Sequence, residues 1–126
     1  NSFINSPKVL DGDFSLRTRS NLFFAGQITG VEGYMESAAS GIMAGLNMAR
    51  RLQGKDTIIL PQETMIGALL NYITSSEHKT FQPINSNWAL VPPIELPKKE
   101  RKNKKLKNEL LSKRSLEILS SIVTNC

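Results

Sequence analysis

The sequence predicts an α/β protein of one small domain or less, in which a short strand leads through a glycine-rich loop into a helix. A short apolar run over 21–25 ends at a glycine, and three glycines follow within Gly26–Gly33. A helical hydrophobic period then covers about 34–53. With 126 residues, 40% hydrophobic and 21% charged, the chain has room for one small domain but not for a multidomain enzyme.

The first twenty residues have the composition of a loop. Pro7 and the Asp11-Gly12-Asp13 turn interrupt any regular period, and we expect only a short strand around Lys8–Leu10. The apolar run Asn21–Ala25 then predicts a buried strand that ends at Gly26.

The spacing over 34–53 predicts a helix that Gly54 terminates. Its packing face is expected at the apolar positions three and four apart, namely Met35, Ala39, Ile42, Leu46 and Ala49. Gly41 and Gly45 each cost about 1 kcal/mol of helix stability relative to alanine. We therefore interpret these glycines, with Ala38 and Ala49, as a surface that packs closely on a sheet or another helix.

The middle of the chain predicts one possible edge strand and one helix. Thr57–Leu60 is the strand, and Pro61 begins a helix with Glu63 in its first turn. The expected buried stripe of this helix is Ile66, Leu69, Leu70 and Ile73. The proline-rich segment 81–97 is expected to be extended, with a strand-like stretch at Asn87–Val91.

The tail predicts a long basic amphipathic helix. Residues from Lys98 onward contain no proline or glycine, and Leu106, Leu110, Leu116, Leu119 and Ile122 keep a broadly helical period. Nine cations and two anions lie between Lys98 and Arg114, a local charge of +7 that exceeds the formal net charge of +5 of the whole chain. We therefore divide the chain into an incomplete domain over 1–97 and a basic helical tail over 98–126.

Composition excludes several classes of protein. The single cysteine, Cys126, cannot form an intrachain disulfide, which argues against a small secreted disulfide scaffold. The longest weakly polar run, Ser37–Ala49, is too short to cross a bilayer. We expect a cytoplasmic protein without membrane contact. Because the chain opens at Asn1 in loop-like sequence, we also expect that an N-terminal part is missing.

The glycine-rich loop is the most specific motif. Its spacing, Gly26-x3-Gly30-x2-Gly33, fits neither the dinucleotide fingerprint nor a phosphate loop. Here a strand ends, glycines leave the backbone uncovered, and a helix begins at once. Several backbone N–H groups therefore point to one place. Such a place suits an anion or a carbonyl, although a purely structural glycine turn explains the spacing equally well.

Three stretches resemble a known family. They are Asn1-Ser-Phe-Ile-Asn-Ser-Pro-Lys-Val-Leu10, Phe24-Ala-Gly-Gln-Ile-Thr-Gly-Val-Glu-Gly-Tyr-Met-Glu-Ser-Ala-Ala-Ser-Gly-Ile-Met-Ala-Gly45, and Phe81-Gln-Pro-Ile-Asn-Ser-Asn-Trp88 with Pro92-Pro93. Over residues 1–97 they are similar to the C-terminal part of the folate- and flavin-dependent tRNA (uracil-5-)-methyltransferases. The related tRNA uridine carboxymethylaminomethyl-modifying flavoproteins share the Ala-Gly-Gln-Ile frame, but typically lack Val31-Glu32 and Glu36-Ser37.

The resemblance implies the C-terminal part of a Rossmann-like FAD-binding flavoprotein fold. It also implies an enzyme that takes a one-carbon unit from 5,10-methylenetetrahydrofolate, reduces its FAD with NAD(P)H and converts T-loop uridine of tRNA to 5-methyluridine. The N-terminal turn that binds the ADP half of FAD has no counterpart here, so this chain by itself is expected to be inactive. No catalytic residue and no metal ligand carries over, and Cys126 lies outside the matching stretches.

The resemblance places the flavin contacts in the glycine loop. The expected cofactor-binding residues are Gly26, Gln27, Ile28, Thr29, Gly30, Gly33 and Tyr34. A helix N-terminus at this place would stabilise negative charge on the pyrimidine edge of the reduced flavin. Gln27 and Thr29 offer side-chain hydrogen bonds, whereas Tyr34 either covers a ring face or fills the core.

Other polar residues favour structural interpretations. Glu32 and Glu36 are four residues apart and could suggest a catalytic acid/base pair. The helix dipole alone explains an acidic residue in the first helical turn, so we favour a structural role. His78 is expected to be a solvated turn residue, because no second histidine accompanies it. The amides Asn5, Gln82, Asn85 and Asn87 are expected to bond neighbouring backbone, with folate or nucleotide contact as the alternative.

The lysine cluster suggests a second function class. Lys102, Lys104, Lys105 and Lys107 could neutralise tRNA phosphates, although such tails are often only solvated faces. No aromatic residue lies among the cations after Trp88, so base stacking by the tail is not supported. Taken as an autonomous chain, the protein would instead be a small basic RNA-binding module.

Overall fold

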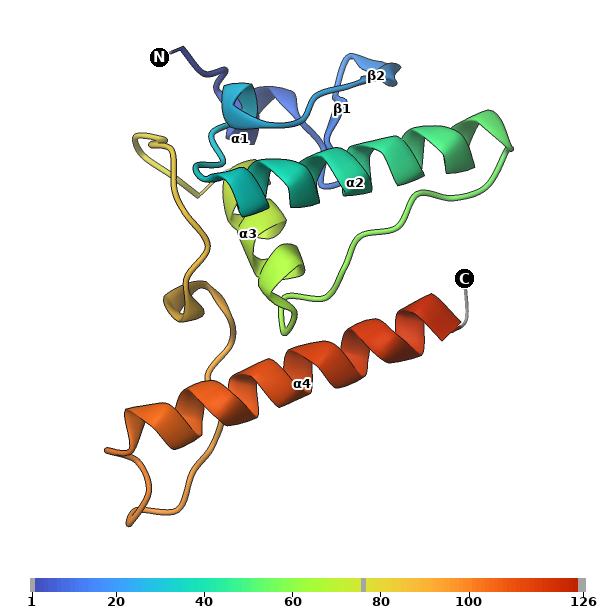
Figure 1. Cartoon of the computed structure of the whole chain (residues 1–126). Coiled ribbons are helices and arrows are strands. Elements are labelled where there is room, and N and C mark those ends of the chain that lie inside the picture. The colour runs from blue at the N-terminus through green and yellow to red at the C-terminus, as the bar shows by residue number, and fades with distance from the viewer. Residues whose placement is uncertain (1, 76, 125–126) are drawn as a thin grey trace.

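Three helices form the frame of the molecule. Figure 1 shows helix α2 (Tyr34–Leu52) beneath the short N-terminal elements, α3 (Met65–Thr74) below α2, and α4 (Lys104–Thr124) along the lower part of the molecule. The shorter elements are α1 (Ser6–Val9), β1 (Ser15–Leu16), β2 (Arg19–Phe23), and the 3₁₀ turns η1 (Gln27–Thr29) and η2 (Trp88–Leu90). This computed structural model describes residues 2–75 and 77–124. It mixes helices with short strands, as the coarse α/β class requires.

The strands form a small antiparallel hairpin beside α2. Ser15 pairs with Phe23 and Leu16 with Arg19, with an irregularity between the two pairs. The predicted burial of the second strand is wrong, because four of the five residues of β2 are exposed. The hairpin contacts α2, where the Arg51 guanidinium lies over the Phe23 ring at 5.1 Å from its centroid.

The strand predicted around Lys8–Leu10 is also wrong. Residues Ser6–Val9 form α1 instead, and Pro7 lies in its first turn, where its missing N–H is not needed. Leu10 makes only an isolated antiparallel bridge to Leu16.

Helix α2 has the predicted bounds within one residue, but it buries the opposite face from the one expected. Ser40, Met43, Ala44 and Asn47 point into the molecule. The predicted packing residues Met35 and Ile42 are 81% and 69% exposed, and Gly41 and Gly45 face open space. The helix is apolar on two sides, and the described residues cover only one of them.

Helix α3 begins four residues later than predicted. Thr64 is its N-cap and accepts a hydrogen bond from the N–H of Gly67 at 2.9 Å, which a start at Pro61 could not provide. The predicted stripe is confirmed at Leu69, Leu70 and Ile73, all of which are buried.

Two predicted strands are absent from the described residues. The segment 57–60 is extended, but it pairs with the side chain of Asn47, which binds the backbone N–H and C=O of Ile58 at 2.7 and 2.9 Å. The stretch 87–91 contains η2, because the side chain of Asn87 accepts the N–H of Ala89 and starts a turn.

The core lies between α2, α3 and the segments before, between and after these two helices. Its largest fully buried side chains include Leu10, Phe14, Leu69 and Ile73. Phe14 is buried although its φ of 68° is unusual for a residue with a Cβ.

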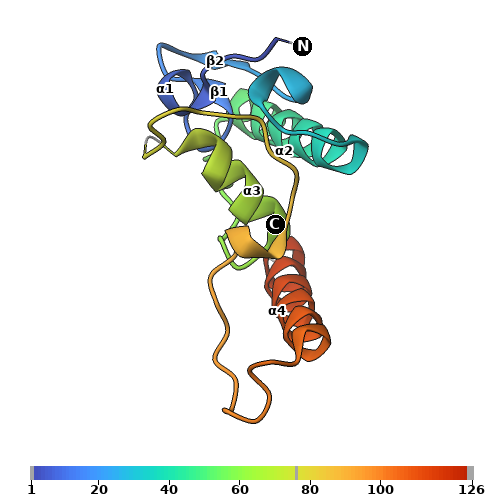
Figure 2. The same cartoon turned by 90° about the vertical axis from the view of Figure 1, so that its left-hand side faces the viewer.

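Helix α4 closes the far end of the molecule. Its Leu111 packs against Ala68 and Val91, and the Ser115 hydroxyl accepts the N–H of Met65. The helix begins at Lys104, because turns occupy 98–102. Figure 2 shows how the chain after α3 runs down one side of α3 to reach α4. No helix among residues 2–75 and 77–124 is long and apolar enough to cross a membrane.

Candidate functional site

The glycine-rich loop between β2 and α2 has the backbone geometry that its sequence predicts. Gly26, Gly30 and Gly33 have φ values of 82°, 101° and 107°, a region that residues with a Cβ rarely adopt. Between the first two, Gln27–Thr29 forms η1, and Gly33 is the N-cap of α2. The loop therefore makes three sharp changes of direction immediately before the helix.

The three glycines face different surroundings. A Cβ on Gly26 would meet nothing within 4 Å, so the backbone there is open to a neighbour. A Cβ on Gly30 would overlap the Phe81 ring, and one on Gly33 would overlap the Glu36 carboxylate. Gly26 thus leaves room for a ligand, whereas Gly30 is required by its contact with the Phe81 ring and Gly33 by its φ of 107°.

The N-terminus of α2 presents backbone donors to this open side. Gly33 supplies no side-chain cap, and the first loop-to-helix backbone bond runs from Ser37 to Gly33. Among the described residues, the N–H groups of Gly33, Tyr34 and Met35 have no hydrogen-bond acceptor. Unpaired N–H groups at the positive end of a helix dipole attract an anionic or carbonyl oxygen.

Two neighbouring segments hold the loop in place. The N–H of Ile4 donates to the carbonyl of Ile28 at 2.8 Å, and the hydroxyl of Ser6 donates to the carbonyl of Thr29 at 2.7 Å. On the other side Ile84 bonds the loop twice, through Gly30 and Glu32. The loop is thus set between residues 4–6 and residues 84–86, which are far apart in sequence.

Glu36 connects the second of these segments to α2. Its carboxylate accepts the N–H and the hydroxyl of Ser86, both at 3.0 Å. The hydrogen bond from the Ser86 N–H is the main cause that lowers the pKa of Glu36. Desolvation opposes it, and further hydrogen bonds, including that from the Ser86 hydroxyl, lower the pKa again. This carboxylate joins α2 to residue 86, and its lack of acid/base work stays a prediction.

Ser40 is a positioning residue that the sequence interpretation missed. It is fully buried in α2, where its hydroxyl accepts the N–H of Gly26 at 2.8 Å and donates to the carbonyl of Ser37. A serine within the stretch of small and apolar residues at the centre of the helix was the available signal, since a buried hydroxyl needs a partner. Ser6, which bonds the same loop, was not distinguishable from other loop serines.

The predicted loop residues differ in what their side chains can reach. Gln27 and Ile28 are exposed beside the open backbone, and Tyr34 is 98% exposed. Tyr34 therefore fills no core within the described residues. Thr29 is fully buried, and its hydroxyl donates to the carbonyl of Gly26 at 2.7 Å, so its proton is used inside the loop.

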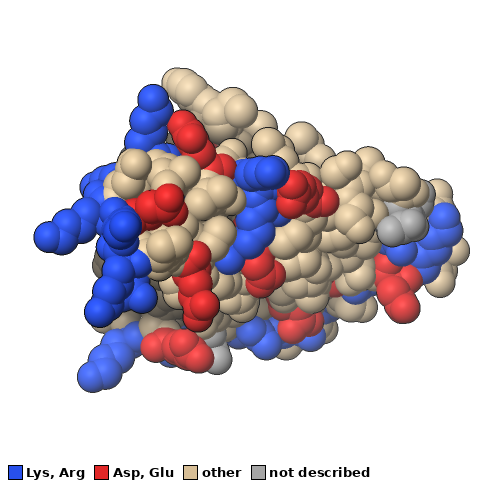
Figure 3. Space-filling model, turned by 90° about the horizontal axis from the view of Figure 1, so that it is seen from below, with Lys and Arg blue, Asp and Glu red and all other residues tan. Residues whose placement is uncertain are grey.

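The structure does not bring the lysine cluster to the glycine loop. Lys102, Lys104, Lys105 and Lys107 are exposed around the start of α4, at the end of the molecule away from α2. Figure 3 shows Lys and Arg side chains gathered at that end. The two predicted sites are therefore separate surfaces.

The other candidates are resolved by their contacts. His78 is half-buried, not solvated as predicted: its Nε2 lies 2.7 Å from the carbonyl of Tyr72 and its ring packs on Tyr72 and Phe81. The amides of Asn85 and Asn87 bond backbone, as expected. Among the described residues no group of three or more His, Cys, Asp or Glu side chains could hold a metal, and Cys126 lies outside those residues.

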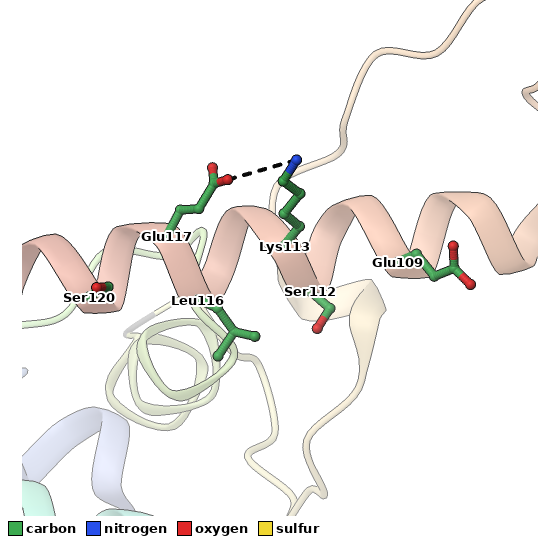
Figure 4. A pocket seen from close by; sticks show the side chains of 6 residues that line it. All are labelled: Glu109, Ser112, Lys113, Leu116, Glu117 and Ser120. Carbon is green, nitrogen blue, oxygen red and sulfur yellow. Dashed lines mark ion pairs between the residues drawn. The ribbon is translucent and has the colours of Figure 1, made fainter.

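A hollow on α4 offers little chemistry. All six residues that line it come from this one helix, as Figure 4 shows, and Lys113 and Glu117 form an exposed ion pair there at 4.0 Å. A surface made by one helix face, without convergent groups from another element, does not resemble a ligand site.

Comparison with known proteins shows which proteins this chain resembles in sequence. The methylenetetrahydrofolate--tRNA-(uracil-5-)-methyltransferase TrmFO of Natranaerobius thermophilus is 51% identical over 123 residues, which are 98% of this chain and 28% of that protein. The protein of the same name from Listeria welshimeri is 53% identical over 122 residues, 97% of this chain and 27% of that protein. The predicted resemblance is confirmed.

Two further matches concern the wider group. Residues 1–56 match the family described as glucose inhibited division protein A. The solved structure of Aquifex aeolicus GidA aligns with a TM-score of 0.57 and 26% identity, over 94% of this chain and 20% of that one.

The methyltransferase match corrects the extent of the resemblance. It was expected over residues 1–97 only, but it covers nearly the whole chain, including most of the basic tail. The chain spans about 28% of the length of the curated relatives it matches.

Proposed function

We propose that this chain is the C-terminal part of a folate- and flavin-dependent tRNA (uracil-5-)-methyltransferase and that its glycine loop completes the FAD site. The observation that supports the proposal most strongly is the open Gly26 backbone beside the unpaired N–H groups of α2, within a sequence about 50% identical to such enzymes. The domain division, with 1–97 completing a Rossmann-like FAD domain and 98–126 as its tail, belongs to the same proposal.

The residues present fit the flavin. Gly26 can let a flat ring edge approach, because no Cβ occupies the space, and Gln27 and Ile28 are exposed on the same loop. The N–H groups of Gly33, Tyr34 and Met35 would hold its pyrimidine edge and stabilise negative charge there. When bound, the flavin supplies the reducing equivalents that complete the transferred methyl group.

The residues around Gly26 then have specific roles in the proposed flavin site. Ser40 fixes the Gly26 N–H, and Thr29 fixes the Gly26 carbonyl, so the open backbone cannot turn away. Tyr34, which no described residue covers, would lie over a ring face or shield the site from water. Methylenetetrahydrofolate as one-carbon donor, NAD(P)H as reductant and T-loop uridine of tRNA as acceptor complete the proposed reaction.

The carboxymethylaminomethyl-modifying flavoproteins are the alternative. The similarity to GidA supports this relationship at the level of the fold. Its 26% identity is about half that of the methyltransferases, so we favour methylation.

The full-length protein tests the proposal. We expect a yellow protein that contains FAD and methylates T-loop uridine only when methylenetetrahydrofolate and NAD(P)H are both supplied. A colourless product, or a start codon close upstream of Asn1, would favour the small RNA-binding module instead. A yellow protein that does not methylate would favour the GidA-like alternative.

A further inference from the structure

A second hollow lies next to the glycine loop and is made by segments distant in sequence. It has a volume of about 300 Å³. Its lining comes from two stretches, the first around α1 and the second after α3: Phe3, Asn5, Pro7, Lys8, His78, Lys79, Thr80 and Phe81. None of the predicted cofactor-binding residues lines it.

The wall of this hollow is largely aromatic. The rings of Phe3 and Phe81 meet edge to face with centroids 5.8 Å apart, and His78 packs against Phe81 at the same centroid distance. His78 cannot rotate freely, because its Nε2 donates to the carbonyl of Tyr72 at 2.7 Å. Phe3 is 39% exposed and therefore offers aromatic surface to a ligand.

The rim of the hollow is positively charged. Each of the two lining stretches contributes one exposed lysine, Lys8 from the first and Lys79 from the second. No acidic residue is part of the lining. Neither lysine makes an ion pair within the described residues. Cations beside aromatic rings, with no competing carboxylate, suit a phosphate joined to a flat base.

The hollow is mechanically connected to the glycine loop. Phe81 supports Gly30 so closely that no side chain fits between them, and Ser6 at the start of α1 bonds the carbonyl of Thr29. A ligand in the hollow would therefore be held at a fixed position relative to the loop.

We propose that this hollow binds an unpaired nucleotide of the RNA substrate, with Lys8 and Lys79 on its phosphate and Phe3 against its base. The inference rests on the proposed methyltransferase function and adds a substrate contact to it. Such a contact would orient the RNA so that the neighbouring target uridine reaches the loop that we assign to the flavin. It is distinct from the lysine cluster at the start of α4.

The experiment uses the full-length enzyme with both lysines replaced, Lys8→Gln and Lys79→Gln. We expect the KM for tRNA to rise about tenfold. The slope of log affinity against log salt concentration should become shallower by the amount that about 1 to 2 lost phosphate contacts produce. FAD content and NAD(P)H oxidation without tRNA should stay at the wild-type level. The matched control removes two exposed cations elsewhere, Arg19→Gln and Lys55→Gln, and should leave the KM within about twofold.

A second variant tests the aromatic contact. Phe3→Leu keeps an apolar side chain against Phe81 but removes the stacking surface, and we expect about a tenfold loss of tRNA affinity with unchanged flavin content. A lysine variant with normal FAD content and a wild-type KM for tRNA would overturn the inference, as would a rise in the KM for NAD(P)H alone. Failure of the wild-type enzyme to bind FAD or to methylate would instead refute the proposed function.

Discussion

Single residues decide the shape of the glycine loop. Gly26, Gly30 and Gly33 share a positive φ, yet only Gly26 is open on the side where a Cβ would stand. Substitutions at the three positions should therefore have different consequences. A change at Gly26 should affect ligand binding most, and changes at the other two should affect folding.

Replacing Gly30 with alanine should destabilise the protein. The substitution adds backbone strain at φ 101° and forces the new methyl group into the Phe81 ring, with an expected loss of about 2 to 4 kcal/mol in the free energy of unfolding. Thermal unfolding of the full-length enzyme measures it. The control, Gly54→Ala, has a positive φ but open surroundings and should lose only about 1 kcal/mol. Equal losses would show that the contact with Phe81 is unimportant.

Asp13 should make stability depend on acid pH. Burial raises the pKa of Asp13, but hydrogen bonds from Ser15 and Thr57 and the charge of Arg51, at 2.8 Å, together lower it below its usual value. A depressed folded pKa means that the stabilisation is complete above the usual carboxyl pKa, near 4, and is lost as pH falls through the folded value.

The expected result for Asp13→Asn is a lower melting temperature at pH 7, equivalent to roughly 1 to 3 kcal/mol, and a smaller further loss on acidification. Melting temperatures of the full-length enzyme from pH 7 to pH 3 would check it. Asp11→Asn is the control, since its pair with Arg17 is exposed and at 3.4 Å. Parallel pH curves for wild type and Asp13→Asn would contradict the assignment.

At the scale of elements, α2 has two apolar faces and this chain covers one. The uncovered face includes Met35, Ile42 and Leu52, which are 69% to 84% exposed, together with Gly41 and Gly45. The close packing predicted for the glycines therefore has no partner among the described residues. We retain it as a prediction for the longer protein.

Gly41→Leu in the full-length enzyme tests this packing. Helix propensity alone would raise stability by about 1 kcal/mol, because glycine is a poor helix former. If another element lies close to Gly41, the melting temperature should fall by several degrees instead, as expected for overpacking by about 1 to 3 kcal/mol. Lys113→Leu on the exposed surface of α4 provides the control and should change little. A higher melting temperature for Gly41→Leu would rule out a close neighbour.

The exposed lysines around the start of α4 remain a predicted tRNA contact, separate from the glycine loop. Charge reversal of Lys102, Lys104, Lys105 and Lys107 to glutamate should weaken tRNA binding and flatten its salt dependence, because each lost phosphate contact lowers the slope by about 0.7 to 0.9. Binding titrations of the full-length enzyme at several salt concentrations measure both quantities. Unchanged affinity would mean that these lysines only solvate the helix.

At the scale of the whole molecule, the chain exposes more surface than its mass requires. Its accessible surface is 8340 Å², whereas a self-contained monomer of this size exposes about 6,700 Å². Large apolar side chains account for part of the excess, including Tyr34, Met35 and Leu52. Such a surface is typical of a piece whose partners are elsewhere in the polypeptide.

The chain expressed alone should therefore unfold without a sharp transition or aggregate. Calorimetry and circular dichroism would check this expectation, with the full-length enzyme as the reference for cooperative melting. A two-state melt of the 126-residue chain, with coincident transitions by both methods, would show that it is an independent domain.

The sequence by itself determined the local features whose causes are local. The bounds of α2, the glycine turns before it and the stripe Leu69, Leu70 and Ile73 follow from spacing and backbone freedom. The family resemblance followed from the glycine loop together with two further stretches, at the start of the chain and around 81–93. The predictions of strands were wrong more often. Residues 57–60 and 87–91 have strand-like composition, but the side chains of Asn47 and Asn87 take the hydrogen bonds that a partner strand would need.

Only the tertiary structure decided which face of α2 is buried and what surrounds each glycine. An apolar period is compatible with burial on either side, and the choice depends on where α3 and the hairpin pack. The tertiary structure also brings residues 3–8 beside 78–81. No local sequence pattern encodes this contact between distant segments. Burial and proximity are properties of the packed chain, because they depend on the residues that approach from elsewhere in the sequence.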